Sequence, residues 1–189
     1  PMPNWFIALP VRGEGWWAEL PPAPAGLRIF AASDLHITVA FLGDVGESRA
    51  RMAFELASEW PADPIAFSLG EVRPLGSPRR PSALSALVDE GGPALSRGIE
   101  LCRDEMLEAA GARPDTRPPL PHATLARIRR KASNAQRRRA LEWASTPGFP
   151  RPSLLADRIA LFTWSRERSR RLFDIVALRD LGLEPSPLR

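Results

Sequence analysis

Two apolar runs, one in each half of the chain, carry a histidine and a threonine two positions apart, and this repeated pattern most constrains the fold. The runs are LHITVAFLG over 35–43 and PHATLARI over 121–128. Alternate side chains of a β-strand share one face, so each run predicts a strand that turns an imidazole and a hydroxyl to the same side. His36 and His122 are the only two histidines, and they lie close to half a chain length apart. We therefore expect two similar halves that each donate one strand to a shared centre.

The apolar residues between these polar positions are expected on the opposite face of each strand, against the core. They are Ile37, Val39 and Phe41 in the first run, and Ala123 and Leu125 in the second. The same alternation turns Arg127 away from His122 and Thr124, unless a bulge redirects its side chain.

Periodicity along the rest of the chain predicts an α+β fold. Apolar or alternating runs predict strands over 4–11, 28–30, 65–72, 83–88, 158–164 and 172–178, the last two as a hairpin. Helical spacing of apolar residues predicts helices over 47–60, 93–110 and 133–143. In the first helix this spacing comes from Met52, Leu56 and Trp60. Strands and helices follow one another without a regular βαβ rhythm, which favours α+β over a doubly wound sheet.

Composition excludes several classes of protein. No apolar run approaches the roughly 20 residues that span a bilayer, and no signal peptide is expected at the start. Cys102 is the sole cysteine, so no intrachain disulfide can form, which suits a reducing cytoplasm. It lies on the apolar face of the helix expected over 93–110, and we interpret it as a core residue.

The two histidine–threonine pairs best fit phosphoryl transfer by a paired general acid and base. Two histidines without a cysteine pair or a nearby carboxylate are too few for a closed zinc site. No GxSxG nucleophile elbow occurs. Displacement at phosphorus is roughly in line, so a proton acceptor and a proton donor belong on opposite sides of the phosphate. The threonine hydroxyls would then bind its non-bridging oxygens, and neither a metal nor another cofactor is expected.

HITVAFLG and PHATLARI resemble the paired HxTx signatures of the two-histidine (2H) phosphoesterases. They are closest to the LigT-like branch, the RNA 2′,3′-cyclic phosphodiesterases historically called 2′-5′ RNA ligases. The resemblance extends to the opening WFIALPV and to the closing IALFTWSRERSRRLFDIVALRDL, so it covers most of the chain. It implies a single bilobal domain over 1–189, with antiparallel sheets of two pseudo-symmetric lobes facing a central cleft and helices outside.

This resemblance also implies an activity and a set of site residues. The activity is hydrolysis of a terminal 2′,3′-cyclic phosphate to a 2′-phosphate, with His36 as proton donor and His122 as acceptor. Thr38, Thr124 and Arg127 would bind the substrate. The expected partners are RNA ends or cyclic nucleotides, tRNA fragments among them; we expect no membrane partner, a monomer and a cytoplasmic location. A 2′-5′ RNA ligase or 2′-5′ phosphodiesterase at the same site, and a non-catalytic RNA-binding module, stay open as alternatives.

Arginine clusters and a tryptophan pair lie outside the two motifs. Basic residues gather over 127–139 and again over 166–171, where they would either attract a polyanion or form a solvated surface. The segment RGEGWWAELPPAPAG over 12–26 is too rich in proline and glycine for more than a turn or two of helix. Trp16 and Trp17 would either stack on a nucleobase or anchor this loop. Tyrosine is absent from the chain, and we expect Phe173 to take the place of any tyrosine contact to substrate.

Overall fold

The computed structural model describes residues 2–182, and it shows an α+β fold built around one curled antiparallel sheet. Its strands are β1 (Trp5–Pro10), β2 (Leu27–Ile29), β3 (His36–Gly43), β4 (Ile65–Leu75), β5 (Ala83–Val88), β6 (His122–Ile128), β7 (Ser153–Ala156), β8 (Arg158–Trp164) and β9 (Phe173–Asp180). Its helices are α1 (Glu47–Glu55), α2 (Gly92–Ala109) and α3 (Asn134–Ala144), with short 3-10 turns η1 (Trp17–Glu19), η2 (Ala32–Asp34) and η3 (Leu56–Glu59). Within the described residues, no helix combines the length and apolarity needed to cross a membrane.

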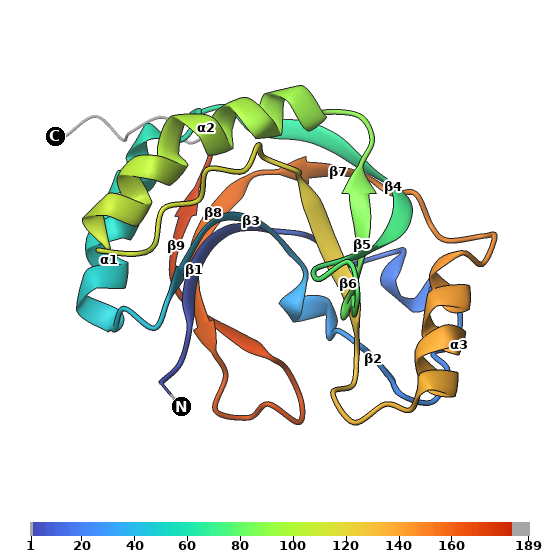
Figure 1. Cartoon of the computed structure of the whole chain (residues 1–189). Coiled ribbons are helices and arrows are strands. Elements are labelled where there is room, and N and C mark those ends of the chain that lie inside the picture. The colour runs from blue at the N-terminus through green and yellow to red at the C-terminus, as the bar shows by residue number, and fades with distance from the viewer. Residues whose placement is uncertain (1, 183–189) are drawn as a thin grey trace, which may run out of the picture.

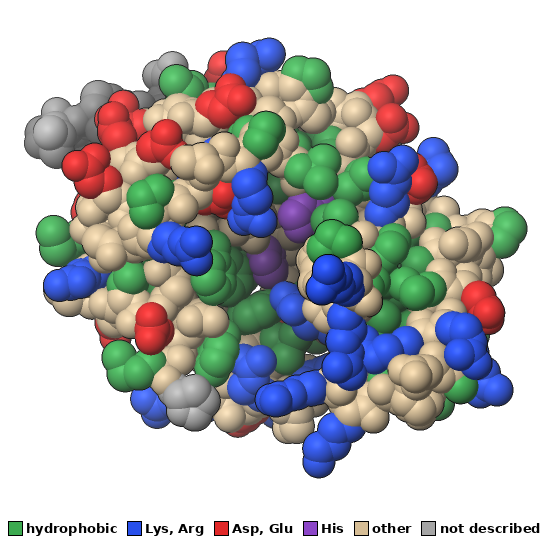
Figure 2. All heavy atoms as spheres, viewed as in Figure 1, with side chains coloured by type: hydrophobic (Ala, Val, Ile, Leu, Met, Phe, Trp, Pro, Cys, Tyr) green, Lys and Arg blue, Asp and Glu red, His purple; other side chains and the backbone are tan. Residues whose placement is uncertain are grey.

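The sheet consists of two halves that meet at a single residue pair. The strand order is β7-β4-β5-β6-β3-β1-β8-β9, and β2 also pairs with β6. Between β3 and β6 only Ile37 and Ala123 are paired, because β2 takes over as the neighbour of β6 from Ala126 to Ile128. The halves therefore splay apart, with α1, α2 and α3 on the outside (Figure 1). The concave side holds a cleft of about 1480 Å³, in which both histidines are visible (Figure 2). The expected fold class, with two sheet halves facing a central cleft, is confirmed.

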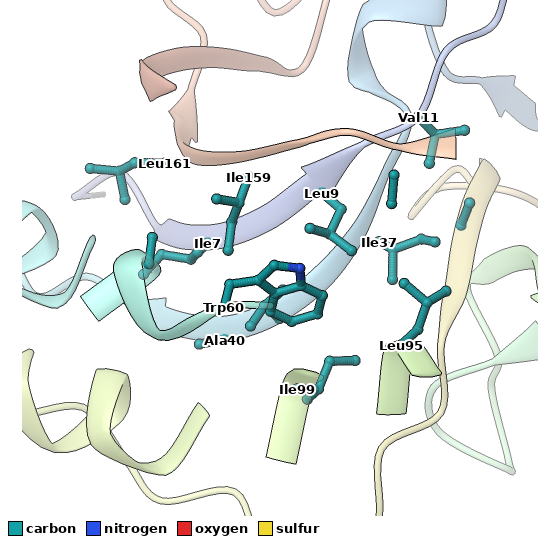
Figure 3. Close-up of a cluster of buried hydrophobic side chains, with 14 of the residues drawn as sticks. Ile7, Leu9, Val11, Ile37, Ala40, Trp60, Leu95, Ile99, Ile159 and Leu161 are labelled. Atoms are coloured by element: carbon teal, nitrogen blue, oxygen red, sulfur yellow. The ribbon is translucent and has the colours of Figure 1, made fainter. Parts of the chain in front are cut away.

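The main core lies between the convex side of β1, β3 and β8 and the helices α1 and α2. It includes Ile7, Leu9, Ile37, Leu95 and Ile159, all of them fully buried (Figure 3). Burying each such side chain contributes about 1.5–3 kcal/mol relative to leaving it in water. A second cluster joins α3 to β2, β5 and β6 through residues such as Leu84, Ile128 and Trp143.

Helix α2 follows the pattern expected from the sequence. It buries Leu95, Ile99, Cys102 and Met106, and proline stands in its first turn. The preceding residue, Gly91, has φ +81°, and a Cβ there would lie 2.3 Å from the carbonyl oxygen of Ala66. Only glycine fits this entry to the helix, since a side chain would meet both strain and a backbone atom.

The first helix is shorter than the sequence predicted. The α-helix ends at Glu55, and the chain continues as the 3-10 turn η3 to Glu59. Met52 is 59% exposed, whereas Trp60 is buried, so the fourfold spacing of large apolar residues did not identify the buried face. Small residues, Ala50, Ala53 and Ala57, are buried instead, which lets the helix approach the core closely. Strand β7 was not expected, because its four residues alternate too briefly to give a signal.

The segment before β3 supports the anchoring interpretation of the tryptophan pair. Trp16 is buried in the main core, and its indole Nε1 donates a hydrogen bond to the carbonyl oxygen of Arg12 at 2.7 Å. Trp17 packs edge-on against Trp16 at the start of η1. Neither ring lines the cleft, so base stacking on these rings has no structural basis.

A buried carboxylate ties η2 to the end of the β8–β9 hairpin. Asp34 is 1% exposed, and it accepts hydrogen bonds from the backbone N–H groups of Leu172 at 2.9 Å and Phe173 at 3.0 Å. A third bond comes from the N–H of Ala31 at 3.3 Å. The bonds to Leu172 and Phe173 join residues that lie far apart in the sequence, and they fix Phe173 beside the cleft.

Replacing this carboxylate should destabilise the protein strongly. We expect Asp34→Ala to lower the free energy of unfolding by about 2–4 kcal/mol, because three backbone N–H groups lose their carboxylate acceptor in a buried place. Urea denaturation followed by tryptophan fluorescence measures the effect. Asp104→Ala is the control, since that side chain is 83% exposed and its loss should change stability by less than about 0.5 kcal/mol. Equal effects of the two substitutions would contradict this role of Asp34.

Candidate active site

The four side chains of the two motifs come together on the concave face of the sheet. Ile37 and Ala123 face each other across the β3–β6 junction and are buried in the core behind it. Their neighbours along each strand therefore point into the cleft, and His36, Thr38, His122 and Thr124 all line it. Antiparallel register places His36 beside Thr124 and His122 beside Thr38. Figure 2 shows the two imidazoles within one hollow.

Each motif strand contains a one-residue bulge directly after its threonine. On β3, Ala40 pairs with Ile7 but Thr38 pairs with Ala8, so Val39 is the extra residue. On β6, Ala126 pairs with Leu84 but Thr124 pairs with Ser85, so Leu125 is the extra residue. A bulge reverses the alternation beyond it, and it does so at corresponding positions of the two halves.

These bulges redirect Phe41 and Arg127, which occupy equivalent places after the two threonines. The expectation that Phe41 packs in the core is wrong: its side chain is 57% exposed and lines the cleft. Arg127, which strict alternation turned to the other face, lines the cleft as well. Its guanidinium lies 5.9 Å from the centre of the Phe30 ring. At equivalent positions of the two strands, β3 thus presents an aromatic ring to the cleft and β6 presents a cation.

The two imidazoles are held by the same kind of hydrogen bond. Nδ1 of His36 donates to the carbonyl oxygen of Asp34, and Nδ1 of His122 donates to the carbonyl oxygen of Leu120, each at 2.6 Å. A carbonyl only accepts, so both rings carry their proton on Nδ1 when neutral. Nε2 of each ring is then free to take a proton, or to give one once the ring is charged.

Aromatic packing distinguishes His36 from His122. The imidazole of His36 lies 4.7 Å from the ring of Phe6, 5.3 Å from Phe162 and 5.4 Å from Phe173, measured between ring centres. Burial disfavours the charged imidazolium and lowers the pKa of His36 to about 4. The hydrogen bond to Asp34 opposes this shift, while the positive charges of His122 and Arg127 add to it.

The two threonines also differ in what supports them. Thr124 Oγ1 lies 3.0 Å from the hydroxyl of Ser85, which is fully buried on β5. The residue opposite Thr38 is Ala8, which offers no hydroxyl. If Ser85 donates to Thr124, the hydroxyl proton of Thr124 stays available for an oxygen of a bound anion.

Several residues in or beside the cleft had no signal in the sequence. Ser85, Phe6 and Phe162 contact the motif side chains from strands far away in the sequence, and Arg28 reaches the cleft from β2. Two cleft residues did have a signal: Arg168 belongs to the basic run over 166–171, and Phe173 was expected in place of a tyrosine. Among the described residues, no group of three or more His, Cys, Asp or Glu side chains could hold a metal ion.

Comparison with known proteins identifies the fold. Neither a protein-family model nor a curated protein matches the sequence. Solved structures do match over nearly the whole chain. E. coli LigT complexed with 3′-AMP is 22% identical, with 95% of this chain and 98% of that chain covered and a TM-score of 0.67. A crystal structure described as a phosphoesterase is 21% identical, with 97% and 100% covered and a TM-score of 0.68. The protein TT0787 of Thermus thermophilus is 20% identical, with 94% and 97% covered and a TM-score of 0.63. The LigT-like resemblance is thereby confirmed at the level of the fold.

The hydrogen bond between Ser85 and Thr124 should couple the effects of their substitutions on the free energy of unfolding. We expect Thr124→Val to lower the free energy of unfolding by about 1–2 kcal/mol, because it leaves the Ser85 hydroxyl buried without its partner. The double substitution Ser85→Ala with Thr124→Val should cost less than the sum of the two single changes. Thr38→Val is the matched control, and it should cost less than Thr124→Val because it orphans no buried group. Urea denaturation of the four variants gives these values; strictly additive costs would contradict the pairing.

Nuclear magnetic resonance can follow both imidazoles separately, because the chain has only two. We expect the pKa of His36 to lie near 4, and both rings to be in the Nδ1–H form when neutral. Long-range ¹H–¹⁵N spectra recorded over a pH titration from neutral to acid report both properties. Added inorganic phosphate should raise the pKa of His36, since an anion in the cleft stabilises the imidazolium. A pKa of His36 at or above its usual value of about 6.5 in the free protein would contradict the effect of the phenylalanine packing.

Proposed function

We propose that this chain is a two-histidine phosphoesterase that hydrolyses 2′,3′-cyclic phosphates at RNA or oligonucleotide ends. One observation carries the proposal: two imidazoles with free Nε2 atoms and identical Nδ1 hydrogen bonds line one cleft, each beside a threonine hydroxyl. Such a pair suits acid–base catalysis on opposite sides of one phosphate. The shared fold with LigT and a phosphoesterase supports the same reaction class.

In this proposal, one imidazole accepts a proton from the attacking water while the other gives a proton to the leaving 3′ oxygen. The bond from water oxygen to phosphorus forms as the bond from phosphorus to the 3′ oxygen breaks, which leaves a 2′-phosphate. Thr38 and Thr124 donate hydrogen bonds to the non-bridging oxygens, where negative charge develops. Every proton in this reaction moves between water, the substrate and the two imidazoles. The side chains of the cleft therefore supply all the proton transfers of the proposed reaction.

The protonation state of His36 limits which of these tasks it performs. In the free cleft the pKa of His36 is about 4, so near neutral pH the ring is in its proton-accepting form. The donor role implied by the LigT-like resemblance requires the bound phosphate to raise this pKa first. An anion placed between two imidazoles does so by simple attraction.

An exposed aromatic ring in the cleft fits a nucleoside substrate. Phe41 presents an exposed ring at one end, and Leu120, the residue whose carbonyl holds His122, is also largely exposed there. Base stacking on an aromatic side chain contributes about 1–3 kcal/mol and tolerates any base. LigT of E. coli has been crystallised with 3′-AMP, NADP+ and ATP, which are nucleotide ligands of that protein. We infer that Phe41 contacts the base of the substrate here.

Removing either imidazole should abolish turnover of a 2′,3′-cyclic nucleotide. We expect His36→Ala and His122→Ala each to lower kcat by about 10²–10⁴-fold, the usual contribution of a general acid or base. Phosphorus NMR measures turnover and also shows which oxygen keeps the phosphate, with a 2′-phosphate expected. Circular dichroism of each variant controls for folding.

Three outcomes would overturn the proposal, the first from this experiment and the others from incubation of the wild-type protein with 2′-5′ oligomers and RNA. Folded variants with rates within about tenfold of the wild type would leave the histidines without a catalytic role. Turnover of 2′-5′ linked oligomers, or joining of RNA ends, without hydrolysis of cyclic phosphates would favour the phosphodiesterase or ligase alternative at the same site. Salt-dependent RNA binding with unchanged end groups would favour the non-catalytic binding module.

A further inference from the structure

Three arginines from three separate elements converge at the end of the cleft beside His36. Arg28 on β2 and Arg127 on β6 are directly paired across the two strands, so they share the concave face. Arg168 comes from the β8–β9 loop, and the guanidinium of Arg28 donates a hydrogen bond to its backbone carbonyl. All three line the cleft. Basic side chains gather along the lower edge of the hollow in Figure 2.

These three guanidinium groups are held by aromatic rings and carbonyl oxygens. Arg127 lies over Phe30, and Arg168 lies 4.8 Å from the centre of the Trp164 ring. Arg168 also donates to the carbonyl oxygen of Leu172 at 3.2 Å. Within residues 2–182, none of the three forms an ion pair with a carboxylate. Such a preorganised arrangement leaves the charges available to a ligand.

At the opposite end of the cleft, by contrast, an arginine is neutralised by a carboxylate. Arg117 there forms a bidentate pair with Asp115, with both hydrogen bonds at 2.8 Å. In the arginine cluster beside His36, the surroundings of Arg127 disfavour its positive charge. Partial burial, and then the charge of Arg168, lower the pKa of Arg127. Like charges held together without a counterion gain most from binding an anion.

We propose that Arg28, Arg127 and Arg168 form a second phosphate site, which binds the phosphodiester on the 5′ side of the nucleotide whose cyclic phosphate lies between the histidines. This inference rests on the proposed function and specifies its substrate as an oligonucleotide with at least one internal phosphodiester. The position of the cluster supports the assignment. Arg127 lies three residues beyond Thr124 along β6, past the bulge at Leu125, and its guanidinium lies over the ring of Phe30. The scissile phosphate is already served by two imidazoles and two hydroxyls.

Three guanidinium groups suit an additional phosphodiester, which a mononucleotide substrate lacks. Their planar donors bind phosphate oxygens in pairs, and a phosphodiester carries two unesterified oxygens for three such groups. Phe41 lies at the other end of the cleft, where the residue equivalent to Arg127 is aromatic. At the two equivalent positions the cleft therefore offers Phe41 to a base and Arg127, with Arg28 and Arg168, to the phosphodiester that precedes it.

The test compares two substrates that share the reacting nucleotide. One is a nucleoside 2′,3′-cyclic phosphate, and the other is the dinucleotide that carries the same cyclic end and one internal 3′-5′ phosphodiester. We expect the wild-type protein to give a kcat/KM at least about tenfold higher for the dinucleotide, mainly through a lower KM. Arg28→Gln and Arg168→Gln should each reduce this preference by about fivefold or more. Arg97→Gln removes the same charge from the exposed side of α2, outside the cleft, and should leave the preference unchanged.

Several results would overturn the second phosphate site. A wild-type protein without preference for the dinucleotide would do so, and so would cluster variants that keep the full preference. Equal losses on both substrates in Arg28→Gln and Arg168→Gln would mean that these arginines serve the reacting phosphate. Arg168→Lys separates geometry from charge, because a lysine keeps the charge but loses the paired donors; it should recover only part of the preference.

A binding measurement keeps this inference distinct from the proposed function. If the wild-type protein turned over neither substrate, the proposed hydrolysis would fail. The affinities for the two 2′-phosphate products, measured by calorimetry, would then decide the matter. Tighter binding of the dinucleotide product, lost in the cluster variants and not in Arg97→Gln, would support the second site on its own. Its contact should also add about one to the slope of log affinity against log salt concentration. Equal affinity for both products would overturn it.

Discussion

The single pair between Ile37 and Ala123 is the constraint on which the candidate site depends. It is the only register contact between β3 and β6, and it fixes where the two halves of the chain touch. Because each motif begins one residue before this pair, both imidazoles fall beside it on the same face. Beyond this pair β2 replaces β3 as the partner of β6, and the sheet opens into the cleft that both imidazoles line.

The backbone of the two halves is more alike than the side chains it carries. Both strands bulge after the threonine, and both histidines donate from Nδ1 to the carbonyl of the residue two positions earlier. The side chains at equivalent positions of the two halves differ. Phe41 corresponds to Arg127, Ala8 corresponds to Ser85, and Asp34 corresponds to Leu120. The symmetric frame places two interchangeable imidazoles, and the asymmetric side chains give each of them a different environment. In the proposed function, that difference would favour one ring as proton donor and the other as acceptor.

Local periodicity was enough to predict the strands that carry the site and the face on which its four polar side chains lie. The same alternation failed after Thr38 and Thr124, because a bulge depends on how the neighbouring strand pairs and leaves no mark in the local sequence. This is why Phe41 was misplaced in the core. The bonds that Asp34 accepts from the backbone N–H groups of Leu172 and Phe173, and the bond between the hydroxyls of Ser85 and Thr124, join residues distant in the chain. Neither serine nor aspartate has a periodicity that could reveal such partners before the fold is known.

Charge and burial at the cleft link substrate binding to the protonation of His36. Three phenylalanine rings and the charge of Arg127 keep this imidazole neutral in the free protein. In the proposed function, a bound phosphate would leave the burial in place but oppose its effect, since it brings a negative charge close to the ring and partly neutralises the nearby arginines. His36 would then take up its proton when the phosphate binds. Burial among aromatic rings lowers the proton affinity of the imidazole, and in this proposal it makes the charge state of the site depend on occupancy.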